Sequence, residues 1–246
     1  MGALEGKKAV ITGGSRGLGR GIAVAFAHAG ADVAVIYRKR AEEAAGAVAD
    51  VEKAGRRGRA YRADVGQWEE ISAAIDTVAA DLGGLDIVVA NAGVANPLVS
   101  LADTTIDRWR KIMSVNLDGA FFTVKAAMPH LLARGGGNVI FMTSPAGEKA
   151  APNQGAYAAT KAALYNMTAT WAKEVAPRGV RVIGLSPGIY ETDMTATVRE
   201  VPAEGRVPIG RFGDPADLGR IATFLCSADA AYLTGIVIRA DGGLIA

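Results

Sequence analysis

Residues 7–30 read KKAVITGGSRGLGRGIAVAFAHAG, which is a short apolar strand, a glycine-rich turn and an alanine-rich helix. The pattern Thr12-Gly13-x-x-x-Gly17-x-Gly19 differs from the G-x-G-x-x-G spacing but relies on the same physics. Glycines permit a tight turn and close approach of the backbone to a ligand, and the start of a helix offers free N–H groups and the positive end of its dipole. Placed between a first strand and a helix, this turn predicts a binding site for the pyrophosphate of a dinucleotide.

The alternation of short apolar runs and helical patterns continues through the chain. Continuous apolar strands such as DIVVA (86–90) and NVIFM (138–142) predict a parallel sheet covered on both faces. Right-handed crossovers then give a doubly wound, Rossmann-like α/β fold of about seven strands. We predict strands at 8–12, 32–37, 59–63, 87–91, 138–143, 180–186 and 236–239, and helices starting near 17, 41, 67, 105, 156 and 215. No linker or repeat divides the chain, so we expect a single domain over residues 1–246.

Composition argues against several classes of function. The net charge of +2 is too small for a nucleic-acid-binding surface. No run of about 18 uncharged apolar residues is present, and the N-terminus enters a strand without a secretory segment, so we expect a cytoplasmic protein with no membrane partner. The single cysteine, Cys226, excludes an intrachain disulfide, and with no His/Cys/Asp cluster we expect no metal site.

The end of the second strand indicates which nucleotide is bound. NAD-binding folds usually place an acidic residue there, where it hydrogen-bonds the ribose 2′-hydroxyl. Here the strand ends at Tyr37 and continues into Arg38, Lys39 and Arg40, and Arg16 in the glycine-rich turn can approach the same place. Planar guanidinium groups suit phosphate oxygens, so we predict a preference for NADP(H), with NAD(H) as the alternative. Ordinary surface cations would give the same pattern.

Two further segments are expected to line the nucleotide site. Asp64-Val65 follows the third predicted strand, where a short carboxylate can meet the adenine edge. Asn91-Ala92-Gly93 follows the fourth, where small residues leave room for a ribose. Both segments lie beyond the carboxyl ends of strands, which is where ligands bind in sheets of this kind.

Tyr157 and Lys161, in QGAYAATKAAL (154–164), indicate proton chemistry. Four residues is about one helical turn, so both side chains point to the same helix face. An ammonium beside a phenol stabilises the phenolate and lowers a hydroxyl pKa that is otherwise about 10. The pair alone is typical of many solvated helices. Beside a nucleotide site, it predicts a proton donor and acceptor for carbonyl reduction or alcohol oxidation.

With these residues in place, the chain resembles the short-chain dehydrogenase/reductase family over essentially its whole length. The matching motifs run from the glycine-rich turn through Asn91-Ala92-Gly93 and Tyr-x-x-x-Lys to Pro187-Gly188 and the final DGG. The resemblance implies an NAD(P)-dependent oxidoreductase that transfers a hydride. It also implies a homotetramer or a homodimer.

The resemblance further implies a catalytic tetrad of Asn116, Ser144, Tyr157 and Lys161. In this tetrad Ser144 positions the substrate carbonyl and Tyr157 passes the proton. Lys161 holds the nicotinamide ribose and lowers the pKa of Tyr157, while Asn116 supports a water-linked proton relay. We expect the cofactor-binding residues to be Gly13, Ser15, Arg16, Gly17, Leu18, Gly19, Tyr37, Arg38, Lys39, Asp64, Val65, Asn91, Ala92, Gly93, Tyr157, Lys161, Pro187, Gly188, Ile189 and Thr192.

Within the family, the chain is similar to the 3-oxoacyl-acyl-carrier-protein reductase-like branch. Gln154 and Arg178 match positions used there, although both are also ordinary surface residues. This implies an NADPH-dependent enzyme that interconverts a secondary alcohol and a ketone, such as a 3-oxoacyl thioester, free or bound to an acyl carrier. Two alternatives stay open. One is a dehydrogenase of another secondary alcohol, such as a sugar or polyol, and the other is a non-catalytic NADP-binding protein with a sensing or structural role.

The segment after PGIYETDM departs from the family pattern. About fourteen residues separate Met194 from Ile209, fewer than in many relatives. By resemblance, this region, at approximately 190–212, forms the substrate lid. A shorter lid predicts a more open pocket, a substrate of different shape or a partly disordered loop, and charges such as Arg199 and Arg206 favour a mobile, exposed stretch.

Overall fold

Seven parallel strands form one sheet in the computed structural model, which describes residues 2–95 and 98–246. The strand order is β3-β2-β1-β4-β5-β6-β7. The strands span Lys8–Thr12 (β1), Asp32–Tyr37 (β2), Gly58–Arg62 (β3), Ile87–Ala90 (β4), Gly137–Met142 (β5), Val180–Pro187 (β6) and Val237–Ala240 (β7). The order reverses between β1 and β4, and doubly wound sheets bind ligands at that point. The predicted Rossmann-like fold is confirmed.

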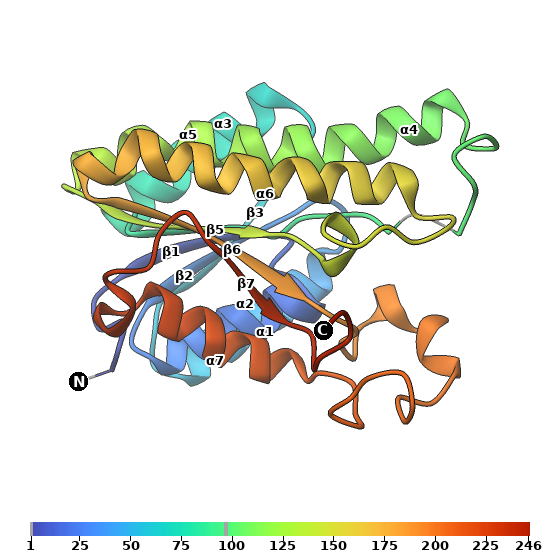
Figure 1. Cartoon of the computed structure of the whole chain (residues 1–246). Helices are drawn as coiled ribbons and strands as arrows, with labels where there is room; N and C mark the ends of the chain where they lie inside the picture. The colour runs from blue at the N-terminus through green and yellow to red at the C-terminus, as the bar shows by residue number, and fades with distance from the viewer. Residues whose placement is uncertain (1, 96–97) are drawn as a thin grey trace.

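Helices cover both faces of this sheet (Figure 1), with α3, α4, α5 and α6 on one side and α1, α2 and α7 on the other. The helices span Gly17–His28 (α1), Ala41–Lys53 (α2), Trp68–Leu82 (α3), Ile106–Met113 (α4), Gly119–Ala133 (α5), Gly155–Val175 (α6) and Pro215–Cys226 (α7). Alternate strand residues therefore enter two separate cores: Val10 packs in one and Ile11 in the other. Burial on both faces explains why the strands read as continuous apolar runs.

The predicted strand bounds agree with the structure for β1 and β2 and differ by about one residue elsewhere. The prediction of one helix starting near 105 was incomplete, because a π-helical turn at Ser114–Asp118 separates α4 from α5. The amide of Gly119 closes this turn by donating to the carbonyl of Ser114. A Cβ on Gly119 would lie 2.6 Å from Cγ2 of Val65, so the glycine lets the helix pack against the loop after β3.

The predicted lid, residues 190–212, lies beside the carboxyl ends of the strands and is drawn in orange in Figure 1. A bridge between Tyr190 and Gly213 closes its base. Two 3₁₀ turns lie within it, at Asp193–Thr195 and Val198–Glu200. The guanidinium of Arg206 donates to the carbonyl of Val198 (2.9 Å), so this side chain bonds within the lid, and the mobility of this stretch stays a prediction. None of the helices within residues 2–95 and 98–246 is long and apolar enough to cross a membrane.

Candidate active site

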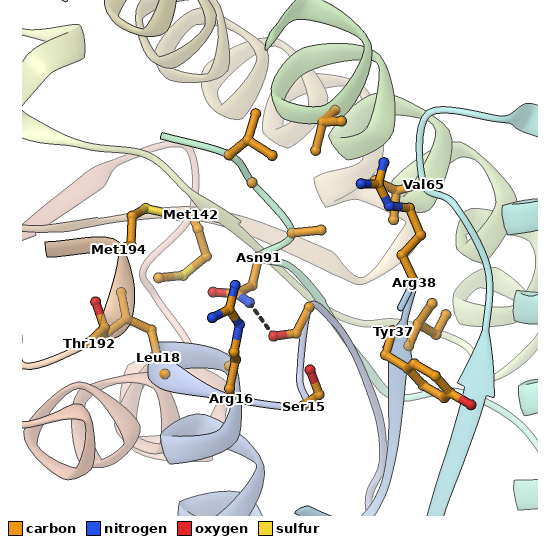
Figure 2. A pocket seen from close by; sticks show the side chains of 18 of the residues that line it. Ser15, Arg16, Leu18, Tyr37, Arg38, Val65, Asn91, Met142, Thr192 and Met194 are labelled. Atoms are coloured by element: carbon orange, nitrogen blue, oxygen red, sulfur yellow. Dashed lines mark hydrogen bonds between the residues drawn. The ribbon is translucent and has the colours of Figure 1, made fainter. Parts of the chain in front are cut away.

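A cavity of about 350 Å³ lies at the carboxyl ends of the strands, between the glycine-rich turn, the end of β2, the segment after β4, helix α6 and the lid. Figure 2 shows Arg16 projecting into this cavity, with Tyr37 and Arg38 on one side and Thr192 and Met194 on the other. One cavity is therefore bordered by the glycine-rich turn and the end of β2 on one side and by helix α6 and the lid on the other.

The glycine-rich turn is shaped for close approach of a ligand. Gly13 and Gly17 have φ of 64° and 54°, which favour glycine. A Cβ on Gly19 would lie 2.4 Å from the carbonyl oxygen of Gly13. Helix α1 starts after Arg16 with no side-chain cap and no acidic residue in its first turn. Its first N–H groups are therefore available to an anion, as the pyrophosphate prediction requires.

Asn91 ties the end of β4 to this turn. Its side-chain amide donates to the carbonyls of Thr12 (2.8 Å) and Gly13 (3.1 Å), and its backbone N–H donates to the Thr12 hydroxyl (3.1 Å). The amide hydrogens are thus used to hold the turn in place. Asn91 lines the cavity as predicted, and its amide fixes the position of the glycine-rich turn, which forms part of the cavity wall.

Three arginines line the nucleotide end of the cavity, and each of them faces a carboxylate. The pairs are Arg16–Asp193, Arg38–Asp64 (3.1 Å) and Arg40–Glu43 (2.7 Å). Lys39 also lines this end and has no ion-pair partner within the part of the chain that the structure describes. The sequence predicted the cations of this cluster, whereas their pairing with acids emerges only from the fold.

Asp64 is held as a carboxylate at this end. Burial alone would raise its pKa, but hydrogen bonds from the Gly66 N–H (3.1 Å) and the Arg38 guanidinium (3.1 Å) outweigh burial and lower it. Asp64 is therefore ionised near neutral pH and offers acceptor oxygens, as expected of a group that meets an adenine edge.

Tyr157 and Lys161 lie on α6 at the other end of the cavity. The Lys161 ammonium donates to the carbonyl of Met142 (2.7 Å), and burial lowers the pKa of Lys161 to about 8. Burial raises the pKa of Tyr157, and a hydrogen bond with Ser144 acts in the opposite direction. Burial therefore dominates the pKa of Tyr157 in the protein alone, and the lowering of this pKa by Lys161 stays a prediction. The ammonium lies 5.5 Å from the centroid of the phenol ring and is bound to a carbonyl.

Ser144 is positioned by a short 3₁₀ turn that follows β5, Pro145–Gly147. Its hydroxyl oxygen accepts from the N–H of Ala146 (3.2 Å), which caps this turn. A Cβ on Gly147 would lie 2.7 Å from the carbonyl carbon of Lys161, so the turn packs directly on α6. This packing places Ser144 within hydrogen-bond reach of Tyr157, although Ser144 does not itself line the cavity.

Tyr165 forms a polar network behind Ser144 that the sequence reading missed. Its hydroxyl lies 3.1 Å from Oγ of Ser186, 3.3 Å from Oε2 of Glu148 and 3.4 Å from the carbonyl oxygen of Ser144. Ser186, on β6, is fully buried. Tyr165 follows Tyr157 by two helical turns, and this spacing could have found it on the same face of α6. The network holds the end of β5 against α6 and β6.

Asn116 lies in the π-helical turn and is buried, with 1% of its surface exposed. Its side-chain oxygen accepts from the N–H of Val94 (2.8 Å), and its side-chain nitrogen donates to the carbonyl of the same residue (3.0 Å). Its neighbour Val115 lines the cavity, but Asn116 does not. Each end of the amide makes one hydrogen bond to Val94, so the side chain anchors the segment after β4, and the proton relay through Asn116 stays a prediction.

Comparison with known proteins assigns this architecture to a family. A family model described as enoyl-(acyl carrier protein) reductase matches residues 13–245. The 3-oxoacyl-[acyl-carrier-protein] reductase of Staphylococcus aureus is 35% identical over 243 residues, which cover 97% of this chain and 98% of that protein. The chain belongs to the short-chain dehydrogenase/reductase family. The resemblance inferred from the sequence motifs is confirmed.

Solved structures of short-chain dehydrogenases/reductases share this fold and differ in what they bind. Carveol dehydrogenase from Mycobacterium avium, in complex with NAD, is 29% identical with a TM-score of 0.94, and the match covers 100% of this chain and 99% of that one. Gluconate 5-dehydrogenase from Burkholderia cenocepacia, in complex with NADP and tartrate, is 35% identical with a TM-score of 0.91, covering 98% and 96%. This protein is therefore an oxidoreductase with a small-molecule substrate.

Most of the cofactor-binding residues predicted for this short-chain dehydrogenase/reductase line the cavity, but Gly188 and Ile189 do not. Gly188 packs instead against the final DGG, where a Cβ would lie 2.7 Å from Cα of Asp241. The cavity is also lined by Arg40, one of the predicted cations, and by residues that were not predicted: Ile36, Ala63, Val94, Val115, Met142, Thr143, Asp193 and Met194. Several lie at the carboxyl ends of strands. Because ligands bind there in doubly wound sheets, the position of these residues alone could have predicted them.

Proposed function

We propose that this protein is an NADPH-dependent reductase that interconverts a ketone and a secondary alcohol, with 3-oxoacyl thioesters, free or carrier-bound, as its substrate class. One observation carries the proposal: a single cavity contacts the arginine cluster at the end of β2 and Tyr157 on α6. The cavity thus joins a site suited to a phosphorylated nucleotide with a site suited to proton transfer.

The residues present fit a nicotinamide dinucleotide, which supplies the hydride when bound. The uncapped start of α1 and the glycine turn would hold the pyrophosphate. Arg16, Arg38 and Lys39 would hold a 2′-phosphate, and Asp64 would accept from the adenine. The ammonium of Lys161 would hold the nicotinamide ribose, at the end of the cavity where Tyr157 lies.

Tyr157 would act as the proton donor. Hydride addition to a carbonyl carbon leaves an alkoxide, which must receive a proton from a group within hydrogen-bond reach. The pKa of Tyr157, which burial raises, leaves its phenol protonated at neutral pH and able to donate. The O–H bond of Tyr157 breaks as the alcohol O–H forms, and solvent then returns a proton to the phenolate. The Ser144 hydroxyl, beside the phenol, would hold the carbonyl oxygen.

Support for a 3-oxoacyl thioester comes from the Staphylococcus aureus relative, which is 35% identical. Gln154 immediately precedes α6, three residues before Tyr157, but it does not line the cavity. Arg178 does not support a thioester substrate within one chain, because it follows the end of α6 that lies away from Tyr157. At 1.5 Å of rise per residue, it lies roughly 30 Å from Tyr157.

A second candidate is a dehydrogenase of a sugar acid or polyol. It is favoured by the 35% identity to gluconate 5-dehydrogenase, whose structure contains NADP and tartrate. Polar groups of the lid that line the cavity, Thr192 and Asp193, suit a hydroxylated substrate as well as a thioester.

Initial rates of reduced-nicotinamide consumption would separate these functions. We expect short 3-oxoacyl thioesters to be reduced with NADPH faster than with NADH, and faster than keto sugar acids with either cofactor. Faster turnover of keto sugar acids would assign the second function. A lack of turnover with both substrate classes, despite tight NADPH binding, would overturn the proposed chemistry.

A further inference from the structure

The lid contacts the glycine-rich turn at two neighbouring points. Asp193 forms an ion pair with Arg16, although the two are 177 residues apart in the sequence. Beside this pair, Thr192 packs on Gly17, where a Cβ would lie 3.3 Å from Cγ2 of the threonine. Figure 2 shows Arg16 between Thr192 and Met194 on one side and Arg38 on the other. The arginine therefore lies within reach of both the lid and the nucleotide end.

Asp193 belongs to a hydrogen-bonded part of the lid. The hydroxyl of Thr195 donates to the carbonyl of Tyr190, and the Arg199 guanidinium donates to the carbonyl of Thr192 (3.2 Å). The hydroxyl of Tyr190 donates to the carbonyl of Ala240 (3.0 Å), at the end of β7. Asp193 therefore lies in a segment that is held together by hydrogen bonds. We expect loss of its ion pair with Arg16 to affect the neighbouring residues of this segment as well.

The Arg16 pair differs from the other two arginine pairs of the cavity. The partners of Arg38 and Arg40 lie in the nucleotide half itself, after β3 and on α2. The partner of Arg16 comes from the lid. The side chains of Arg16 and Asp193 are 47% and 74% exposed, so this ion pair is open to exchange with a soluble anion. A phosphate offers a guanidinium more charge than a carboxylate and can accept two parallel hydrogen bonds.

We propose that Asp193 is a cofactor-specificity residue that competes with the 2′-phosphate of the cofactor for Arg16. Binding of a 2′-phosphate exchanges one ion pair for another and releases the lid from the glycine-rich turn. A cofactor without this phosphate leaves the Arg16–Asp193 pair in place. The proposal rests on the NADP(H) preference proposed above.

Two nucleotides that differ only in the 2′-phosphate, 2′,5′-ADP and 5′-AMP, test this exchange without turnover. Hydrogen exchange would be followed at the lid amides of Thr195 and Ala196, which donate to Thr192 and Asp193. We expect saturating 2′,5′-ADP to speed their exchange severalfold and 5′-AMP to leave it unchanged. Unchanged lid exchange with bound 2′,5′-ADP would overturn the proposal.

Asp193→Asn provides the second arm, with affinities measured by calorimetry. Because an exposed ion pair is weak, we expect this variant to bind 2′,5′-ADP roughly two- to fivefold more tightly and 5′-AMP unchanged. Glu200→Gln is the matched control, since it removes the same charge from a lid residue that has no ion pair among the residues described. An equal gain in the control would overturn the competition and indicate a general charge effect.

The two arms separate this proposal from the proposed function. Wild-type protein that prefers 2′,5′-ADP, together with an Asp193→Asn variant of unchanged affinity, would overturn the competition and keep the NADP(H) preference. Wild-type protein that binds both nucleotides equally would overturn the preference itself, and the proposal with it.

Discussion

The two ends of the cavity are built in different ways. The nucleotide end consists of arginines that are partly or largely exposed and paired with carboxylates, such as Arg16 with Asp193. The chemical end consists of partly or fully buried polar groups, in which Lys161 is 5% exposed and donates to a carbonyl. Exposed pairs are screened by solvent and contribute little individually, whereas buried groups without full compensation shift in pKa. Changes at the chemical end should therefore alter rate strongly, and changes at the nucleotide end should alter cofactor choice.

The largest expected effect is that of Tyr157→Phe. Removing the proton donor should lower kcat for reduction by about 10²- to 10⁴-fold, the usual contribution of general acid catalysis. NADPH affinity, measured by fluorescence titration, should change little, because the ring remains. A variant that keeps most of its turnover would mean that another group donates the proton.

Arg38→Asp should have the next largest effect, at the opposite end. Reversing this charge removes a charge-assisted hydrogen bond and places a carboxylate near the 2′-phosphate, so the NADPH/NADH ratio of kcat/KM should fall roughly 10- to 100-fold. Arg59→Asp is the matched control, because this residue lies on β3 and does not line the cavity. An unchanged ratio would show that the end of β2 does not select the cofactor.

The pH dependence of reduction tests the burial of Lys161. Burial lowers the pKa of Lys161 to about 8, so its ammonium is present below that pH and is lost above it. We expect kcat/KM for reduction to be level from about pH 6 to 7.5 and to fall about tenfold per pH unit well above 8, as the free-enzyme pKa dictates. A profile that stays level to pH 10 would mean that Lys161 keeps its ordinary pKa or that its charge is not needed.

The smallest expected effect is that of Tyr165→Phe. This change removes the hydroxyl that bonds Ser186 and the Ser144 carbonyl, and a typical hydrogen bond contributes about 1 kcal/mol, or roughly fivefold in rate. We expect kcat to fall by about that factor while KM for NADPH stays constant. Tyr61→Phe, which removes a surface hydrogen bond to Asp81, is the control. Equal losses in both variants would indicate a general loss of stability.

Local pattern predicted much of the fold and part of the site. The bounds of β1 and β2, the glycine-rich turn and the shared helix face of Tyr157 and Lys161 all follow from nearby residues. The contact of Asp193 with Arg16 could not be predicted, because 177 residues separate them and only the fold brings them together. The π-helical turn was missed because its residues continue a helical pattern.

The direction of the Tyr157 pKa shows a further limit of sequence reading. The four-residue spacing placed Lys161 near Tyr157 but said nothing of the Met142 carbonyl that holds the ammonium, or of the burial of both groups. A pKa depends on desolvation as much as on neighbouring charge, and desolvation is a property of the packed structure.

A spectroscopic titration of tyrosinate tests the central claim most directly, which is that burial keeps Tyr157 protonated and ready to donate. The absorbance of wild-type protein minus that of Tyr157→Phe would isolate this phenol in the cofactor-free state. The structure predicts that it ionises above the ordinary value of about 10, so that Tyr157 stays predominantly protonated between about pH 6 and 9. Ionisation below about pH 9 would show that Lys161 lowers the pKa after all, and would contradict the account.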